Sequence, residues 1–338
     1  MFVPRATSAA IDTSALYAFS SFQFTNCGIT GATGPTLTNC TSAYTGTSWV
    51  TNTAYFNVIT QGFQLWTVPK SGSYLIDCIG ACGGAAASGS NYGAGARMQE
   101  VVTLTKSSKL QIIVGQMGSS ASGGCGGSVG GGGGGSFVVK ETASYATLNN
   151  NWANINQYVI VVAGGGGGRA LNIVDATFGN ATLSVDANRG DGSALNSGAG
   201  GIGSALGAGG AGTGGCVVGG HGGGSLINNG AVSDGSDLGG KGIFRSAGTA
   251  MGNGGATAGF PSGGFGGGAG GGQYMGGGGG GLSGGGGGGI TACACTNLYG
   301  GGGGGSFSVN RSSAPWYGST QANYNFTTHG SVTITFIA

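Results

Sequence analysis

The chain has 338 residues, of which 85 are glycine and only 6% are charged, and its formal net charge is +2 at pH 7. So weak a charge argues against nucleic acid or an anionic membrane as a partner, and no apolar run reaches the roughly 20 residues of a membrane-spanning helix. Because 39% of the residues are hydrophobic and strand-like runs are plentiful, the composition also argues against disorder driven by charge.

The first predicted element is an N-terminal arm over residues 1–20, which are small and polar with a few aromatic residues. Residues 1–8 lack the apolar core of a secretory signal, so we expect a chain without a leader. Residues 22–24 alternate between apolar and polar side chains, as a half-buried strand does. A turn-rich loop follows, and a bridge between Cys27 and Cys40 would staple it.

Two hairpins are predicted next. Residues 62–69 alternate and end at a proline, and after a short turn residues 73–79 are expected to pair with them. Residues 100–104 and 110–114 form the second expected pair, around a polar turn.

Three further strands complete the predicted sheets. Residues 137–139 and 158–163 are expected to be inner strands, and residues 331–337 the closing strand. No amphipathic helix of ordinary length is visible. We therefore expect an all-β sandwich with glycine-rich segments inserted between its strands.

Runs of glycine dominate the second half of the chain. Six-residue runs lie at 130–135, 276–281, 284–289 and 300–305. A flexible linker is one interpretation, but two of the runs lead directly into strand-like sequence, at Ser136 and Ser306. We therefore favour an ordered bundle of polyglycine II helices, which have three residues per turn and must pair their backbone groups with neighbouring segments. The glycines expected to be structural are Gly130, Gly135, Gly276, Gly281, Gly284, Gly289, Gly300 and Gly305.

These elements divide the chain into an arm, a sandwich and glycine-rich insertions. The expected boundaries are 1–20 for the arm, 21–118 for the first part of the sandwich, 119–135 for a glycine-rich insert, 136–163 for further sandwich strands, 164–305 for the polyglycine bundle and 306–338 for the closing strands.

Eight cysteines are present, an even number that fits disulfide bonds in a chain of low charge. The candidates for disulfides, or for buried thiols, are Cys27, Cys40, Cys78, Cys82, Cys293 and Cys295. Zinc is the less favoured alternative, because the close pairs are spaced Cys-x3-Cys and Cys-x-Cys and not Cys-x2-Cys. No metal site is expected.

No catalytic or cofactor-binding constellation is apparent. The glycine run after residues 158–163 imitates a dinucleotide fingerprint but lacks a following helix pattern, and Lys241 lacks the Ser or Thr of a P-loop. His221 and His329 have no neighbouring nucleophile and acid, so exposed or packed histidines are the favoured interpretation. We expect neither an enzyme nor a cofactor.

Several motifs that suggest binding have a simpler structural interpretation. Four aspartates in loop-like sequence could bind calcium, but carboxylates that are merely solvated are the favoured interpretation. They are Asp186, Asp191, Asp234 and Asp237. The tripeptide Arg189-Gly190-Asp191 is of the integrin-binding type, but such triplets are common in glycine-rich sequence. Glycosylation sequons begin at Asn39, Asn180, Asn310 and Asn325. Aromatic residues that suit either a recognition surface or the core are Trp49, Tyr55, Trp152, Tyr274, Trp316 and Tyr317.

An ordered set of motifs resembles a known receptor module. The motifs are Cys27-Gly28-x-Thr30-Gly31-x-x-Gly34-Pro35-Thr36 with Cys40, Ala43-Tyr44, Gly46-Thr47-Ser48, Gly62-Phe63-Gln64-Leu65-Trp66-Thr67-Val68-Pro69, Gly72-x-Tyr74 and Ile113-Val114-Gly115-Gln116-x-Gly118. Together they resemble the glycine-rich extracellular module of the anaplastic lymphoma kinase and leukocyte tyrosine kinase receptors, over residues 22–338. The chain is also similar to glycine-rich proteins of large DNA viruses and phages, and polyglycine bundles resemble the tips of some phage tail-fibre adhesins.

The resemblance implies a tumour-necrosis-factor-like, jelly-roll β-sandwich with an inserted bundle of polyglycine II helices. Since the sequence has no kinase domain or growth-factor-like repeat, the leading hypothesis is a non-enzymatic structural protein of a virion surface, either capsid-associated or fibre-like. The expected partners are then copies of the chain, preferably as a trimer, and other structural proteins. The alternative is an extracellular adhesin or receptor-type module that recognises a host-surface glycan or protein through loops at the ends of the bundle.

Overall fold

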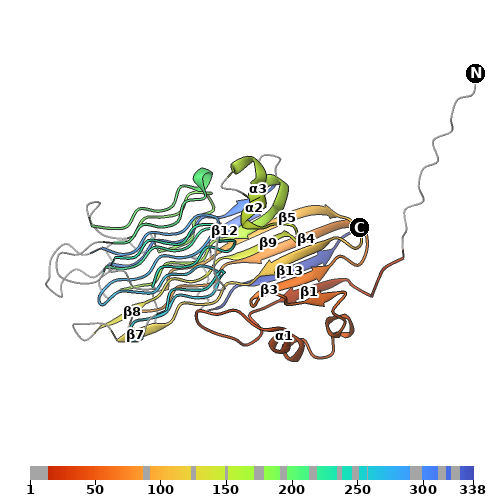
Figure 1. The fold of residues 1–338 in the computed structure, drawn as a ribbon, viewed down its shortest axis with the longest axis horizontal. Coiled ribbons are helices and arrows are strands. Elements are labelled where there is room, and N and C mark those ends of the chain that lie inside the picture. The colour runs from red at the N-terminus through yellow and green to blue at the C-terminus, as the bar shows by residue number, and fades with distance from the viewer. Residues whose placement is uncertain are drawn as a thin grey trace, which may run out of the picture.

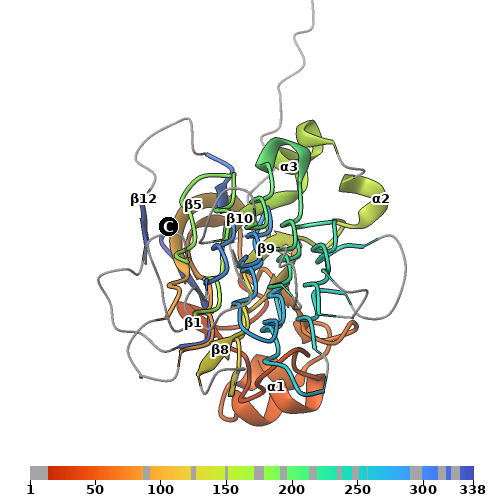
Figure 2. The same ribbon diagram turned by 90° about the vertical axis from the view of Figure 1, so that its left-hand side faces the viewer.

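The fold combines a pair of β-sheets with a body of glycine-rich segments that extends from one end of the sheets (Figure 1). The computed structural model describes residues 14–86, 92–122, 127–148, 151–170, 179–190, 196–212, 219–233, 238–245, 251–256, 258–289, 299–310, 317–320 and 328–338. We call the glycine-rich segments together the glycine-rich body. Viewed from its end, they are gathered side by side, with α1 on one side and α2 and α3 on the other (Figure 2).

Strand pairing is antiparallel throughout the described sheets. The first sheet has the order β1 (Ser21–Phe24), β13 (Ser331–Phe336), β4 (Gly72–Ile79), β5 (Ala96–Leu104) and β12 (Tyr317–Thr320). The second has the order β11 (Phe307–Ser308), β10 (Val159–Ala163), β9 (Ser136–Lys140), β6 (Lys109–Ile113), β3 (Phe63–Thr67) and β2 (Phe56–Asn57). β7 (Ser120–Ser122) and β8 (Ser128–Gly130) form a small separate sheet.

The described helices are short, which agrees with the expectation of an all-β chain. They are α1 (Leu37–Ala43), α2 (Tyr145–Leu148), α3 (Trp152–Tyr158) and the 3-10 helices η1 (Ser48–Thr51) and η3 (Gly203–Ala205). None of the helices in the described ranges has the length and hydrophobicity needed to cross a bilayer.

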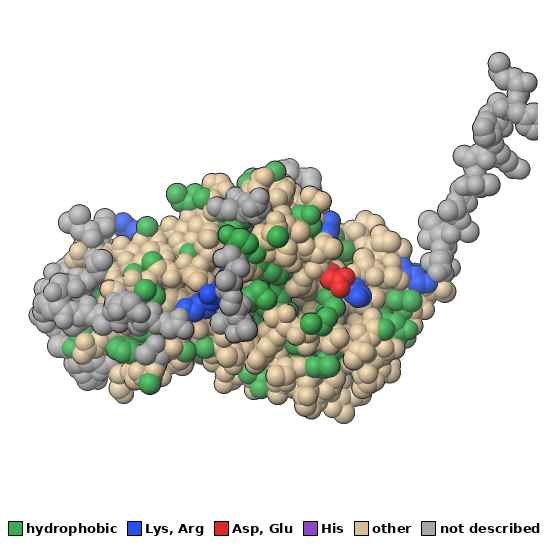
Figure 3. All heavy atoms as spheres, viewed as in Figure 1, with side chains coloured by type: hydrophobic (Ala, Val, Ile, Leu, Met, Phe, Trp, Pro, Cys, Tyr) green, Lys and Arg blue, Asp and Glu red, His purple; other side chains and the backbone are tan. Residues whose placement is uncertain are grey.

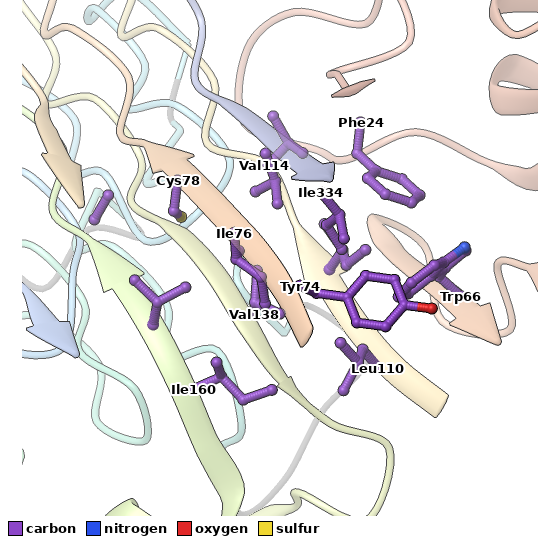
Figure 4. Close-up of a cluster of buried hydrophobic side chains, with 14 of the residues drawn as sticks. Phe24, Trp66, Tyr74, Ile76, Cys78, Leu110, Val114, Val138, Ile160 and Ile334 are labelled. Carbon is purple, nitrogen blue, oxygen red and sulfur yellow. The ribbon is translucent and has the colours of Figure 1, made fainter. Parts of the chain in front are cut away.

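The main core lies between the two sheets (Figure 4). On β4, Tyr74, Ile76 and Cys78 are fully buried at alternate positions, as a strand with one face inside requires. Trp66 of β3 meets Tyr74 edge to face, with ring centroids 5.9 Å apart. The strand predicted at residues 22–24 is confirmed as β1, and its Phe24 is fully buried in this core.

The N-terminal segment that the structure describes packs on the same core. Tyr17 stacks on Trp49, with ring centroids 5.2 Å apart, and Phe19 lies 5.1 Å from Trp66. Residues 1–13 of the predicted arm lie outside the described residues. Residues 14–20 form no strand, and the side chains of Tyr17 and Phe19 pack against the core of the sandwich.

A second apolar cluster covers the outer face of the second sheet. Phe137 and Val139 of β9 pack there against Ile155 of α3 and against apolar side chains of the glycine-rich body, including Phe265 and Leu282. β9 and β10 are therefore buried on both faces, which explains their continuous apolar sequences. The inner strands predicted at residues 137–139 and 158–163 are confirmed as β9 and β10, except that Tyr158 ends α3.

Both predicted hairpins are wrong. β3 pairs with β2 and β6 in the second sheet, whereas β4 pairs with β5 and β13 in the first. β5 and β6 are likewise in different sheets. The turns at residues 68–71 and 105–108 carry the chain across the core, so strands that follow one another face each other through their side chains. Alternation of apolar residues is the same for a strand that pairs with its predecessor and for one that faces it, so the sequence pattern could not distinguish the two.

Two buried serines join the glycine-rich body to the second sheet. Ser136 and Ser306 each follow a glycine run and each begin or precede a strand. The Oγ of Ser136 accepts the backbone N–H of Gly115 at 3.0 Å and donates to the carbonyl of Ile79 at 2.6 Å. The Oγ of Ser306 accepts the N–H of Gly164 at 3.0 Å. Each hydroxyl therefore satisfies a backbone group at a point where a strand ends and a glycine-rich segment begins.

We predict that Ser136→Ala lowers the free energy of unfolding by about 1–3 kcal/mol, because the buried N–H of Gly115 loses its acceptor. Urea unfolding of the purified chain measures the loss. The control is Ser120→Ala in β7, where the side chain is exposed and the expected change is within about 0.5 kcal/mol. Equal effects of the two substitutions would contradict this role of Ser136.

Candidate functional site

Residues 276–281, which we call the central run, are buried in the middle of the glycine-rich body. Three successive N–H groups of the run donate to three different neighbouring segments. The next three N–H groups donate to the same three segments in the same order. The bonds run from Gly276 to Tyr299 and Gly279 to Gly302, from Gly277 to Gly130 and Gly280 to Gly133, and from Gly278 to His221 and Gly281 to Gly224, at 2.9–3.3 Å. None of them lies within the run.

The carbonyl groups of the central run accept bonds from three further segments. The donors are Gly288 and Gly285, Gly168 and Gly165, and Ala269, at 2.8–3.0 Å. A β-strand alternates between two neighbours and an α-helix bonds within itself, so neither produces this pattern. The run is thus held by six surrounding segments through backbone groups alone.

The glycines singled out from the sequence lie where the backbone of another segment approaches closely. A Cβ atom would overlap a carbonyl oxygen of a neighbouring segment at Gly130, Gly276, Gly281, Gly284, Gly289 and Gly305. The approach is looser at Gly135 and Gly300, where the nearest atoms would lie 3.0 and 3.1 Å away. Side chains are excluded by this packing at most positions of the runs.

The described cysteines are all buried. The Sγ atoms of Cys27 and Cys40 lie 2.8 Å apart, with Cys40 inside α1. The hydrogen bond with Cys27 and burial raise the pKa of the Cys40 thiol above its usual value. Cys78 donates to the carbonyl of Ser136 at 3.3 Å, and burial raises its pKa. Cys125, Cys216, Cys293 and Cys295 lie outside the described residues.

Neither histidine is part of a catalytic arrangement with a described nucleophile and acid. His221 is fully buried, and its Nδ1 accepts the backbone N–H of Ser233 at 3.4 Å. His329 accepts the N–H of Met117 at 3.0 Å, and burial lowers its pKa. Among the described ranges, no three His, Cys, Asp or Glu side chains are grouped as metal ligands would be.

The remaining motifs fall mostly on structural positions. The run at 164–168, which imitates a dinucleotide fingerprint, donates its backbone hydrogen bonds to other segments of this chain, including the carbonyl groups of Gly280 and Gly277. Asn39 belongs to the capping box of α1, and Asn310 donates to the buried carboxylate of Glu100 at 2.7 Å. Trp49 is buried in the core. Asp191, Asp234, Asp237, Trp316, Asn325 and the side chain of Tyr317 lie outside the described residues.

The structure gathers four lysines that are scattered in the sequence. They are Lys70, Lys106, Lys109 and Lys140. Lys109 begins β6 and Lys140 ends the neighbouring antiparallel strand β9. Both therefore lie where the strands end, on the side of the sheet away from the glycine-rich body. The N–H of Lys106 donates to the Oγ of Ser71, next to Lys70, at 2.9 Å. We call this the lysine-rich end; elsewhere charged side chains are sparse, as on the face in Figure 3.

A cleft of about 470 Å³ opens at the lysine-rich end. It is lined by Thr103, Leu104, Thr105, Ser107, Ser108, Lys109, Leu110, Lys140, Glu141, Thr142 and Ile160. A smaller cleft of about 200 Å³ shares Glu141 and includes Ile59, whose side chain is 78% exposed. Sequence reasoning missed this end because its lysines lie in separate turns and strand termini.

Recognition was expected in loops at the ends of the bundle. Within the predicted bundle, residues 171–178, 191–195, 213–218, 234–237, 246–250 and 290–298 lie outside the described residues. Among the described residues, the larger cleft lies at the opposite end of the sheets, where the lysines gather.

Comparison with known proteins finds a partial match to a receptor. No family model matches the chain. The leukocyte tyrosine kinase receptor of Mus musculus is 39% identical over 99 residues, which are 29% of this chain and 11% of the receptor. The chain thus matches about a tenth of the receptor's length, in its ectodomain region and not in its kinase domain.

This match supports the part of the resemblance that concerns the receptor. It is consistent with a non-enzymatic module, as expected from the sequence. The resemblance to glycine-rich proteins of viruses and phages remains a prediction, and the match gives no support to a place on a virion.

We predict that Gly286→Ala lowers the free energy of unfolding by about 3 kcal/mol, because its Cβ would overlap the carbonyl oxygen of Gly198 and the backbone around it is packed. The matched control is Gly300→Ala, where the nearest atom is 3.1 Å away and the expected cost is about 1 kcal/mol or less. Urea unfolding measures both. Equal stability of the two variants would show that close backbone packing is not what the glycines provide.

We predict that Cys27 and Cys40 form a disulfide under oxidising conditions, since their sulfur atoms are adjacent. Mass spectrometry of the unreduced chain after proteolysis should find the two peptides linked. For a loop of this length the bond is expected to stabilise the chain by about 3 kcal/mol. The difference in stability between oxidised and reduced protein should disappear in Cys40→Ala and persist in Cys78→Ala, and its persistence in both would contradict the pairing.

Proposed function

We propose that the chain is an extracellular, non-catalytic, receptor-type module that binds a ligand. The observation that carries this proposal is the 39% identity to the ectodomain region of a tyrosine kinase receptor. Buried cysteines with adjacent sulfur atoms fit an oxidising compartment. The ligand class is a glycan or a protein on or near a cell surface.

We propose further that the two sheets form a tumour-necrosis-factor-like jelly roll and that the glycine runs are polyglycine II helices. The three-residue period of the bonds made by the central run supports the second point, because polyglycine II has three residues per turn and no internal hydrogen bonds. In the proposed domain plan, residues 164–305 form the bundle, residues 119–135 add an insert to it, and the strands on either side form the sandwich.

The proposed role of the bundle is to hold the sandwich rigidly. The central run shares backbone hydrogen bonds with six segments and so cannot bend independently of them, and the runs at 130–135 and 300–305, to which it bonds, lead into strands of the second sheet. A receptor-type module gains from this because loops held on a rigid scaffold lose less entropy when a ligand binds. The virion hypothesis, with its trimer and structural partners, has no comparable observation behind it.

The test combines particle mass with binding. Light scattering of the purified chain should give a small, uniform particle, and the fluorescently labelled chain should bind saturably to intact cells, or to a component of the conditioned medium, of the organism that produces it. Gly286→Ala, in which the body is disrupted, is the control for nonspecific adhesion. A large homogeneous assembly, or binding that does not saturate, would overturn the receptor-type function in favour of a structural one.

A further inference from the structure

The cleft at the lysine-rich end has the size of a small-ligand site. Its volume of about 470 Å³ lies within the range of about 300–1,000 Å³ that is usual for such sites. Its walls come from the turn between β5 and β6, the end of β9 and the start of β10. These elements belong to both sheets, so the cleft is held by the sandwich itself.

The chemistry of the lining combines hydroxyl groups with apolar patches. Five hydroxyl side chains surround it, those of Thr103, Thr105, Ser107, Ser108 and Thr142. Leu104, Leu110 and Ile160 supply apolar surface between them. A saccharide presents hydroxyl groups at its rim and C–H groups on its ring faces, so the lining complements both.

Charge adds a preference for anions. The cleft lining carries two lysines, Lys109 and Lys140, and one glutamate, Glu141, which gives it a net charge of +1. The Nζ of Lys109 lies 3.4 Å from the Oε1 of Glu141. Lys140 forms no ion pair with a described residue, and the Lys140 side chain is exposed at the cleft. Lysine ammonium groups at a rim are suited to sulfate or carboxylate groups.

The turn that forms one wall is fixed in a costly conformation. Ser107 has φ of +68°, which residues with a side chain seldom adopt. Its N–H donates to the carbonyl of Val68 at 2.9 Å, and the N–H of Val68 donates to the carbonyl of Ser108 at 2.8 Å. Glycine would suit this backbone better, so Ser107 holds its side chain at the cleft at a local conformational cost.

We propose, on the basis of the receptor-type function above, that this cleft binds an anionic saccharide, with sulfate or carboxylate groups held by Lys109 and Lys140 and sugar hydroxyls held by the Thr and Ser side chains. Glu141 sets the selectivity, because its carboxylate repels anions placed on its side of the cleft. A protein ligand would require a flat contact of about 800 Å² per partner, far larger than this opening.

The experiment is calorimetric titration of the full chain with three probes in 0.15 M salt. They are a heparin-derived octasaccharide, a hyaluronan octasaccharide and neutral maltooctaose. We expect binding of the first if sulfate is the recognised group, of the second if carboxylate suffices, and of neither more than maltooctaose if the proposal is wrong. A phosphorylated peptide of equal charge that binds as tightly as the saccharides would also overturn it.

Substitutions distinguish binding in the cleft from nonspecific binding to positively charged side chains. Lys140→Ala should weaken the binding about tenfold, as expected for loss of one charge-assisted contact, whereas Glu141→Gln should strengthen it several-fold. Ser107→Gly should weaken binding without lowering the unfolding midpoint, since glycine suits the backbone there. Arg189→Gln, which removes one charge from the glycine-rich body, is the matched control and should have no effect; an effect equal to that of Lys140→Ala would overturn the assignment.

Failure of this proposal can be distinguished from failure of the receptor-type function. If no anionic saccharide binds but the chain is a small particle that binds cells saturably, only the assignment of the cleft is wrong. If the chain forms a large assembly and still binds heparin through Lys140, the receptor-type function is wrong and the cleft is not.

Discussion

The need to satisfy buried backbone groups governs this structure. In most domains the core is filled by side chains and the sheets or helices satisfy the backbone internally. In the glycine-rich body the segments are themselves the core, and the N–H and C=O groups of the central run bond to six surrounding segments. Glycine is costly to order, so the arrangement depends on many segments forming these bonds together. The same close approach leaves no room for Cβ atoms, which ties the composition of the chain directly to its packing.

The boundary between this body and the sandwich is where two different periods meet. Strands repeat every two residues and the bonds of the central run every three, so a chain that passes from one to the other leaves backbone groups mismatched at the junction. Ser136 and Ser306 lie at such junctions, and their hydroxyl groups fill the gaps. The serine after each glycine run is therefore as much a part of the architecture as the glycines.

Local patterns in the sequence were sufficient for the strands, but not for their partners. β1, β9, β10 and β13 were found from alternation or from continuous apolar runs. The pairing of β3 with β4 was predicted wrongly, because facing across a core and pairing within a sheet leave the same pattern. The lysine-rich end could not be found, since its four lysines are brought together only by strand order. The adjacency of Cys27 and Cys40 was anticipated because the loop between them is short.

The order of strands in the first sheet also determines when the protein can finish folding. β13 lies between β1 and β4, yet it is made from residues 331–336, close to the end of the chain. Until these residues have left the ribosome, the first sheet lacks a central strand and the partner edges of β1 and β4 remain open. Domains whose paired strands are far apart in the sequence fold slowly, and their unpaired strand edges are exposed until folding is complete. The sandwich is thus completed only after the whole glycine-rich body has been synthesised.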